Sequence, residues 1–365
     1  MVPKSGHQTI GLSIDRDPPA LGRVVRGGGR SAIIGLVHKA PQRRVMEGPC
    51  GSESSGPLGT SPHAISLRWL RLWGRLVVAQ DIADHARALD DFFPGAHFFT
   101  DLDRMERHLV KSAIVGERLD FISICSPNYL HDGHVRFSLR NGTDAICEKP
   151  VVINPWNLDL LRDEEIRSGR RVWTILQLRL LPVLVALRER IAASDASQRF
   201  TVDLSYVTER GRWYFTSWKG DEELSGGIAT NIGIHFFDLL GWVFGPVEDL
   251  AVHLRRPQVV AGTLRLQRAD VRWFLSVDAA HLPVHIREEG GKTFRSITVD
   301  GAELDFTDYG AEDLHTVSYR CIMDGTGFGL DEAAPSVELT HKVRTVALSA
   351  ADGSEHPMVR SIAHE

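Results

Sequence analysis

Apolar and polar positions follow their most regular pattern in the middle of the chain, where they predict a strand, a helix and a second strand. Positions 121–125 form a continuous run of strand type, and positions 143–147 form another. Between them, Ser126 is suited to cap a helix and Pro127 to open it. Strands joined in this way are parallel, with a right-handed crossover. We therefore predict that both strands end at the same edge of a sheet, where such sheets bind ligands.

The pattern changes beyond Val151. Positions 199–207 alternate as one face of a half-exposed strand should, and positions 262–278 and 295–306 are typical of hairpins. The second hairpin has an Asp300-Gly301 turn, and a closing helix is expected from Ser336 onward. Successive antiparallel strands with a few helices predict an α+β domain at 151–365, packed on an α/β domain at 75–150.

Residues 1–74 show no sustained periodicity. They hold 12 of the 33 glycines and 7 of the 17 prolines, and 10 Lys and Arg against 4 Asp and Glu. We interpret this stretch as an irregular segment, either the product of a frameshift or misassigned start, or a disordered region. Re-sequencing the locus and finding this reading frame intact would rule out the first explanation.

Composition excludes several classes of protein. A formal net charge of −5, with 43% hydrophobic and 24% charged residues, is ordinary for a globular protein and gives no indication of nucleic-acid binding. The four cysteines form no C-x-x-C pair, which favours reduced thiols in the cytoplasm. The chain shows no signal peptide, no apolar run long enough for a membrane span and no set of metal ligands.

The sequence Glu148-Lys149-Pro150 directly follows the second strand. A lysine in a ligand-binding cleft can hydrogen-bond a substrate hydroxyl and stabilise the alkoxide that develops during oxidation. The alternative is a surface Glu-Lys pair that merely closes a strand.

A second cluster follows Gly226-Gly227, which open a helix. Asn231 and His235 are four positions apart and share one helix face, and Asp238 is placed to accept a hydrogen bond from the imidazole. The alternative is a structural histidine on an amphipathic helix.

The preceding loop, positions 206–227, contains Arg210, Arg212, Lys219 and two tryptophans. Such a loop suits an anionic, sugar-like ligand or, alternatively, a subunit interface. Asp81 ends an earlier strand, where dinucleotide-binding folds use an acid to bind the adenosine ribose.

The strings "SICSPNYLHDGHVRFSLRNGTDAICEKP" and "SGGIATNIGIHFFDLLGWVFG" resemble the glucose–fructose oxidoreductase, inositol dehydrogenase and MocA (Gfo/Idh/MocA) family. Further strings, "INPWNLD", "LQLRL" and "RGRWYFTSWKGD", are similar to its UDP-N-acetyl-2-amino-2-deoxyglucuronate 3-dehydrogenase branch in bacterial O-antigen synthesis. The likeness runs from about position 75 to near the C-terminus. It implies a Rossmann domain, a second domain with an open, mainly antiparallel sheet, and NAD as cofactor. A homo-oligomer, dimer or tetramer, is also implied.

The resemblance also implies roles for individual residues. Lys149 and His235 correspond to the catalytic pair. The expected cofactor contacts are Asp81, Ser126, Pro127, Asn128, His131, Glu148, Trp156 and Gln177. The expected substrate contacts are Lys149, Arg179, Arg212, Tyr214, Ser217, Trp218, Lys219, Asn231 and His235.

The start of the chain departs from the family. Positions 31–35 are a candidate for the first Rossmann strand, but a G-x-G-x-x-G motif opened by Gly35 would place its other glycines at Val37 and Ala40. The first strand and its glycine turn therefore look degraded. Our leading hypothesis is NAD-dependent oxidation of the C3 hydroxyl of a UDP-linked N-acetylglucosaminuronic acid, with Asp81 favouring NAD over NADP. The alternatives are an inactive or cofactor-free remnant, or another sugar or inositol dehydrogenase of the family.

Overall fold

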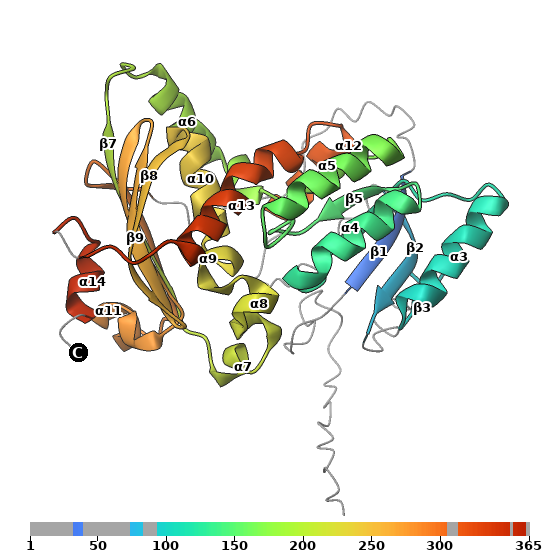
Figure 1. Cartoon of the computed structure of the whole chain (residues 1–365), viewed down its shortest axis with the longest axis horizontal. Coiled ribbons are helices and arrows are strands. Elements are labelled where there is room, and N and C mark those ends of the chain that lie inside the picture. Colours follow the sequence, from blue (N-terminus) through green and yellow to red (C-terminus); the bar gives the residue numbers. More distant parts are fainter. Residues whose placement is uncertain (1–31, 39–73, 83–92, 305–312, 351–352, 363–365) are drawn as a thin grey trace, which may run out of the picture.

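The computed structural model describes residues 32–38, 74–82, 93–304, 313–350 and 353–362 (Figure 1). Two six-stranded sheets lie in two halves of the molecule. The sheet in the first half has the order β3-β2-β1-β4-β5-β6. Its strands are β1 (Ala32–His38), β2 (Gly74–Asp81), β3 (His97–Phe99), β4 (Phe121–Ile124), β5 (Asp144–Cys147) and β6 (Val172–Thr174). Its helices are α3 (Leu102–Ile114), α4 (His131–Arg140) and α5 (Trp156–Ser168).

The predicted strand–helix–strand unit is confirmed, since β4 and β5 pair in parallel on either side of α4. The helix start was predicted wrongly. A short 3-10 turn, Asn128–Leu130, comes first, and α4 begins only at His131. The Ser126 hydroxyl bonds Nδ1 of His134 at 2.8 Å instead of capping the helix.

The strand candidate at 31–35 corresponds to β1, which lies between β2 and β4. It pairs antiparallel with both, so that Ala32 is opposite Asp81 and Ile33 is opposite Ile124. In a Rossmann sheet this central strand runs parallel to its neighbours. Because the direction is reversed, the chain leaves β1 at the edge opposite the carboxyl ends of β4 and β5. The residues that follow, 39–73, and the predicted irregularity of most of 1–74 lie outside the described residues.

The second sheet has the order β12-β11-β7-β10-β9-β8 and is mainly antiparallel, as predicted, with a parallel β7–β10 pair. Asp300 and Gly301 form the predicted hairpin turn, and both have positive φ angles, 51° and 79°. The strands are β7 (Phe200–Thr208), β8 (Val247–Arg256), β9 (Val259–Leu266), β10 (Ala269–Ser276), β11 (Thr293–Val299) and β12 (Ala302–Glu303). The helices are α6 (Pro182–Ala193), α7 (Arg212–Phe215), α8 (Glu222–Ser225), α9 (Gly227–Asn231), α10 (Ile234–Phe244) and α11 (Val284–Glu288).

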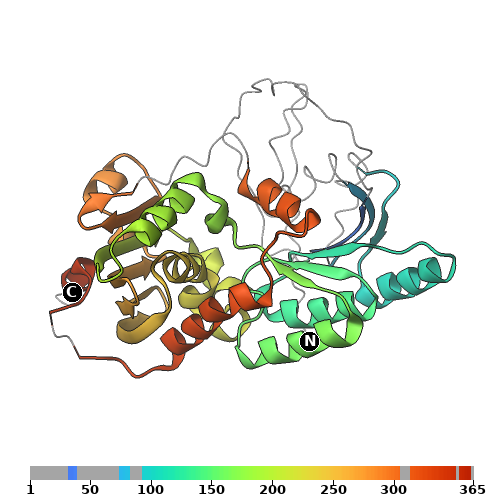
Figure 2. The ribbon, with the colours of Figure 1, turned by 90° about the horizontal axis from the view of Figure 1, so that it is seen from above.

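Three further helices complete the described chain: α12 (Leu314–Met323), α13 (Leu330–Thr345) and α14 (Pro357–Ile362). The closing helix predicted from Ser336 is α13, which begins earlier, at Leu330, and tolerates Pro335. Figures 1 and 2 show α13 running between the two halves. Its Leu330 and Val337 belong to the core of the first half, whereas Leu339 and Val343 belong to the core of the second. Each buried side chain of this kind contributes about 1.5–3 kcal/mol, so α13 joins the two halves firmly.

Among the described helices, none is by itself long and apolar enough to cross a membrane. The bent pair Glu222–Asn231 and Ile234–Phe244 passes that test only when the two are taken together, across a 43° break. Cys125 and Cys147 are buried and form no disulfide.

Candidate functional site

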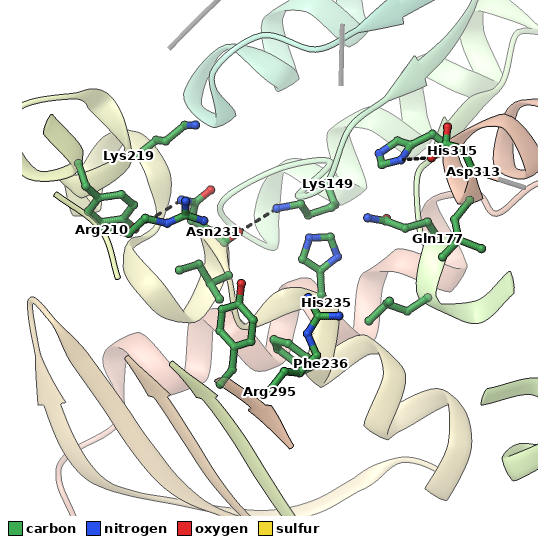
Figure 3. Close-up of a pocket in the computed structure, with 15 residues that line it drawn as sticks. Lys149, Gln177, Arg210, Lys219, Asn231, His235, Phe236, Arg295, Asp313 and His315 are labelled. Carbon is green, nitrogen blue, oxygen red and sulfur yellow. Dashed lines mark hydrogen bonds and ion pairs between the residues drawn. The ribbon is translucent and has the colours of Figure 1, made fainter. Parts of the chain in front are cut away.

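A cavity of about 630 Å³ opens where the end of β5 meets the second half of the molecule (Figure 3). This size is typical of sites for small molecules and cofactors. The lining residues come from both halves: Lys149, Gln177, Leu178, Tyr206, Arg210, Tyr214, Lys219, Asn231, Ile232, His235, Phe236, Arg295, Asp313, Leu314 and His315. The cavity therefore contains both residues predicted to be catalytic.

Lys149 enters the cavity from the end of β5, as its position before Pro150 predicts. Its ammonium donates to the backbone oxygen of Asn231 at 2.8 Å (Figure 3). Burial lowers the pKa of Lys149 to about 8, with Lys219 and Arg210 adding to the effect and Glu148 opposing it. A lysine with this pKa is still mostly charged at neutral pH and can donate to a ligand oxygen.

His235 lies in the first turn of α10 and, in Figure 3, beside Lys149. Burial, followed by the charges of Lys149, His315 and Arg295, lowers the pKa of His235 well below its ordinary value. The imidazole is therefore neutral at physiological pH and can accept a proton.

The expected contact between His235 and Asp238 is not formed. Both oxygens of the Asp238 carboxylate accept from Arg179 instead, at 2.7 and 2.9 Å. Both side chains are buried, and burial raises the pKa of Asp238 more than Arg179 lowers it. The same guanidinium donates to the backbone oxygen of Glu332 at 2.9 Å. Arg179 is absent from the cavity lining and its side chain is held by this ion pair, so its contact with substrate stays a prediction.

Basic side chains dominate the cavity wall. Lys149, Arg210, Lys219 and Arg295 line it, together with His315, and Asp313 is the acidic residue of the lining. Burial and Arg210 lower the pKa of Lys219. A wall of this kind attracts an anionic ligand and supplies charge-assisted hydrogen bonds.

Of the residues predicted to contact substrate, Tyr214, Lys219 and Asn231 line the cavity as well. Asn231 Nδ2 donates to the Tyr214 hydroxyl at 3.5 Å. Arg212, Ser217 and Trp218 are absent from the cavity lining. Arg212 is exposed, and the Ser217 hydroxyl donates to the backbone oxygen of Tyr214 at 2.9 Å.

Gln177 fits a role in cofactor or substrate binding. Its Oε1 atom is buried at the cavity and has no hydrogen-bond partner among the described residues. A buried acceptor without a partner is costly, and a ligand amide or hydroxyl would satisfy it. Asp81 is also buried at the end of β2, where a ribose acid is expected. These residues are compatible with bound NAD, since Gln177 lines the cavity and Asp81 ends β2.

The other predicted cofactor contacts mostly support the protein itself. Asn128 donates to the backbone oxygen of Ser225 at 2.8 Å and so ties the two halves together. His131 is buried with its ring nitrogens 2.6 Å from the Pro150 oxygen and 2.8 Å from the Ser126 oxygen. It therefore holds the ends of β4 and β5 together. Pro127 is buried beside them, whereas Trp156 is exposed and contacts His341 edge-on.

Sequence reasoning missed four polar lining residues, Tyr206, Arg295, Asp313 and His315. Tyr206 was assigned only to a strand face. Arg295 comes from β11 and lies over the Tyr206 ring, 5.7 Å from its centroid. Asp313 and His315 stand at the start of α12 in an unremarkable sequence, "EDLH". For Tyr206 and Arg295, the sequence signal is the alternation of inward and outward residues along β7 and β11, because these two residues are paired directly across the two strands. Among the described residues, no group of three or more His, Cys, Asp or Glu side chains could hold a metal ion.

Comparison with known proteins agrees with this geometry. The model of the Gfo/Idh/MocA "oxidoreductase family, NAD-binding Rossmann fold" matches residues 76–175, and that of its "C-terminal alpha/beta domain" matches residues 198–287. The WlbA (WbpB) dehydrogenase of Thermus thermophilus, solved with NAD and α-ketoglutarate, is 46% identical, with a TM-score of 0.76. The match covers 80% of this chain and 94% of that one. The chain belongs to the Gfo/Idh/MocA oxidoreductase family.

Further matches show the range of similar proteins. The same Thermus dehydrogenase, solved in complex with NAD and UDP-GlcNAcA, is 45% identical, with a TM-score of 0.77. That match covers 82% of this chain and 96% of the Thermus chain. D-glucoside 3-dehydrogenase of Escherichia coli is 23% identical over 170 residues, 47% of this chain and 46% of that protein. In two other curated relatives, the matched region covers only 30% and 51% of the relative's own length.

Proposed function

We propose that this family member catalyses NAD-dependent oxidation of the C3 hydroxyl of UDP-N-acetylglucosaminuronic acid to a 3-keto nucleotide sugar, in cell-surface polysaccharide synthesis. The observation that carries this proposal is the placement of Lys149 and His235 in one cavity with a basic wall. A diphosphate and a uronate carboxylate give the proposed substrate the negative charge that such a wall attracts. The identity of 45–46% to a dehydrogenase solved with NAD and UDP-GlcNAcA supports the same substrate class.

The chemistry of the two central side chains follows from their charge states. The ammonium of Lys149 donates to the C3 oxygen and stabilises the negative charge that develops there. The neutral imidazole of His235 accepts the hydroxyl proton. Bound NAD would take the hydride, and Gln177 and Asp81 would help to hold it. Arg210, Lys219 and Arg295 bind the anionic groups of the substrate.

Subunit association and location are further parts of the proposal. Trp213 and Phe215 on α7 are 47% and 40% exposed, close to the cavity residues Tyr214 and Lys219. Exposed aromatic side chains beside a site support burial against a second copy in a dimer or tetramer. The buried thiols of Cys125 and Cys147 support a reducing, cytoplasmic environment.

The direct test is spectroscopic. Purified protein, NAD and UDP-N-acetylglucosaminuronic acid are mixed at comparable concentrations, and NADH absorbance is followed from the first turnover. We expect NADH to form, and kcat/KM to fall by about 10–100-fold with UDP-N-acetylglucosamine, because the lost carboxylate removes charge-assisted hydrogen bonds.

Two control measurements separate the alternatives. Faster oxidation of free inositol or glucose than of the uronate would replace the proposed substrate with a neutral polyol. A melting temperature that does not change on addition of millimolar NAD, together with no NADH, would identify an inactive remnant.

The pH dependence tests the charge state of Lys149. We expect kcat/KM to fall as the pH rises through about 8, because Lys149 loses the proton that it donates to the substrate oxygen. His235 should add no limb between pH 6 and 8, because its pKa lies well below that range. A rate that rises through pH 8 would instead show that the neutral amine of Lys149 takes the substrate proton.

A further inference from the structure

A chain of three ionisable side chains lies at one wall of the cavity, where Asp313 and His315 line it and the third, Glu148, is buried. Nε2 of His315 lies 3.4 Å from Oε1 of Glu148, and Nδ1 of the same ring lies 3.8 Å from Oδ1 of Asp313. His315 and Asp313 come from the start of α12, whereas Glu148 directly follows β5 and precedes Lys149. Figure 3 shows His315 and Asp313 on the side of Lys149 that faces away from Arg210 and Lys219.

The carboxylate of Glu148 is buried and needs a counterion. Burial alone would raise the pKa of Glu148, but His315, with smaller effects from Lys149 and His131, outweighs burial and lowers it. His315 is itself mostly buried, which lowers its pKa, yet Asp313 and Glu148 raise the value to about 10. His315 is therefore a permanent cation at physiological pH, unlike His235, which is neutral.

The charge of Glu148 also affects the pKa of Lys149. Burial lowers the pKa of Lys149, and Glu148 raises it by its negative charge. The groups that face Lys149 from the other elements, Lys219 and Arg210, act with burial. Glu148 thus has the main opposing effect, and it has that effect only while it is ionised.

We propose that His315 is a positioning residue whose fixed positive charge keeps Glu148 ionised and so keeps Lys149 in the ammonium form that donates to the substrate. The role in the reaction rests on the proposed function, whereas the effect on Lys149 does not. His315 itself needs no contact with the reacting atoms, because it acts through Glu148.

The test compares His315→Gln, which removes the charge, with His315→Lys, which keeps it. Loss of the counterion lets Glu148 take up a proton, so the pKa of Lys149 falls. We expect the falling limb of the kcat/KM profile to move down by about one pH unit in His315→Gln, which lowers the rate at pH 8.5 about sixfold more than at pH 6.5. The limb should return toward its original position in His315→Lys.

A second readout does not depend on turnover. The rate at which acetic anhydride labels Lys149 in the intact protein is measured against pH by mass spectrometry, with the exposed Lys342 as internal reference. We expect the midpoint for Lys149 to fall by about one unit in His315→Gln. If this shift occurs in a protein that makes no NADH, the inference holds and the proposed function fails.

Matched variants complete the design. His285→Gln changes an exposed histidine on α11 and should leave both profiles unmoved. In a Glu148→Gln background, His315→Gln should add no further shift, because the carboxylate through which it acts is gone. Unchanged midpoints in His315→Gln, or equal impairment in His315→Lys, would overturn the proposal and leave His315 a purely structural residue.

Discussion

Replacement of Lys149 by methionine should lower kcat by about 10³-fold, because the substrate oxygen loses the ammonium that stabilises its developing charge. Methionine has a similar length and keeps the buried part of the side chain in place. The only described hydrogen bond that the substitution removes is the one to the backbone oxygen of Asn231, so the fold should survive. The measurement is single-turnover NADH formation at saturating NAD and nucleotide sugar.

The control is Lys111→Met, on the exposed side of α3, which should react at the wild-type rate. NAD affinity, measured by fluorescence titration, should change little in Lys149→Met. A variant that keeps more than about a tenth of the wild-type rate would remove Lys149 from the chemistry proposed for it, since catalysis by a positioned acid or base is worth at least about 10²-fold.

Replacement of Arg179 by methionine should destabilise the protein by about 3–5 kcal/mol, because it leaves Asp238 buried without its partner. The free energy of unfolding is measured by urea titration. The comparison is Arg162→Met, whose guanidinium pairs with the exposed Asp159 and Asp331 and should contribute less than about 1 kcal/mol.

The loss in Arg179→Met should also depend on pH. Burial already holds the pKa of Asp238 above its ordinary value, and removal of Arg179 raises it further. An acid whose pKa is raised on folding costs nothing below its unfolded pKa, and the cost grows as the pH rises toward the folded value. The variant should therefore lose more stability at pH 8 than at pH 4. An equal loss at both values would show that Arg179 acts by packing and by its bond to Glu332 alone.

The sequence predicts those parts of the structure that local patterns determine. The strand–helix–strand unit and the Asp300-Gly301 turn follow from periodicity and from the preference of glycine for positive φ, so both are found as predicted. Lys149 and His235 also line one cavity as predicted, because parallel strands carry their carboxyl ends to one edge and the first turn of α10 reaches the cavity there.

Local patterns did not predict the contacts between residues that are far apart in the sequence. The helix spacing placed Asp238 within reach of His235, but Arg179, 59 positions away in the sequence, approaches in the fold and takes both carboxylate oxygens. Likewise, nothing near Asp313 and His315 in the sequence indicates that β5 lies opposite them. The spacing of apolar residues predicts which face of a helix or strand is buried, but not which polar group of another element that face will contact.

The position of α13 affects whether the two halves of the protein can separate or fold independently. Its first turns close the core of the nucleotide-binding half and its last turns close the core of the other half. A chain shortened ahead of Leu330 would expose apolar surface on both at once, so neither half would remain a soluble fragment with an intact interior. If the two halves separated to open the cavity, α13 would have to detach from one of the two cores. Ligand entry is therefore restricted to smaller local movements.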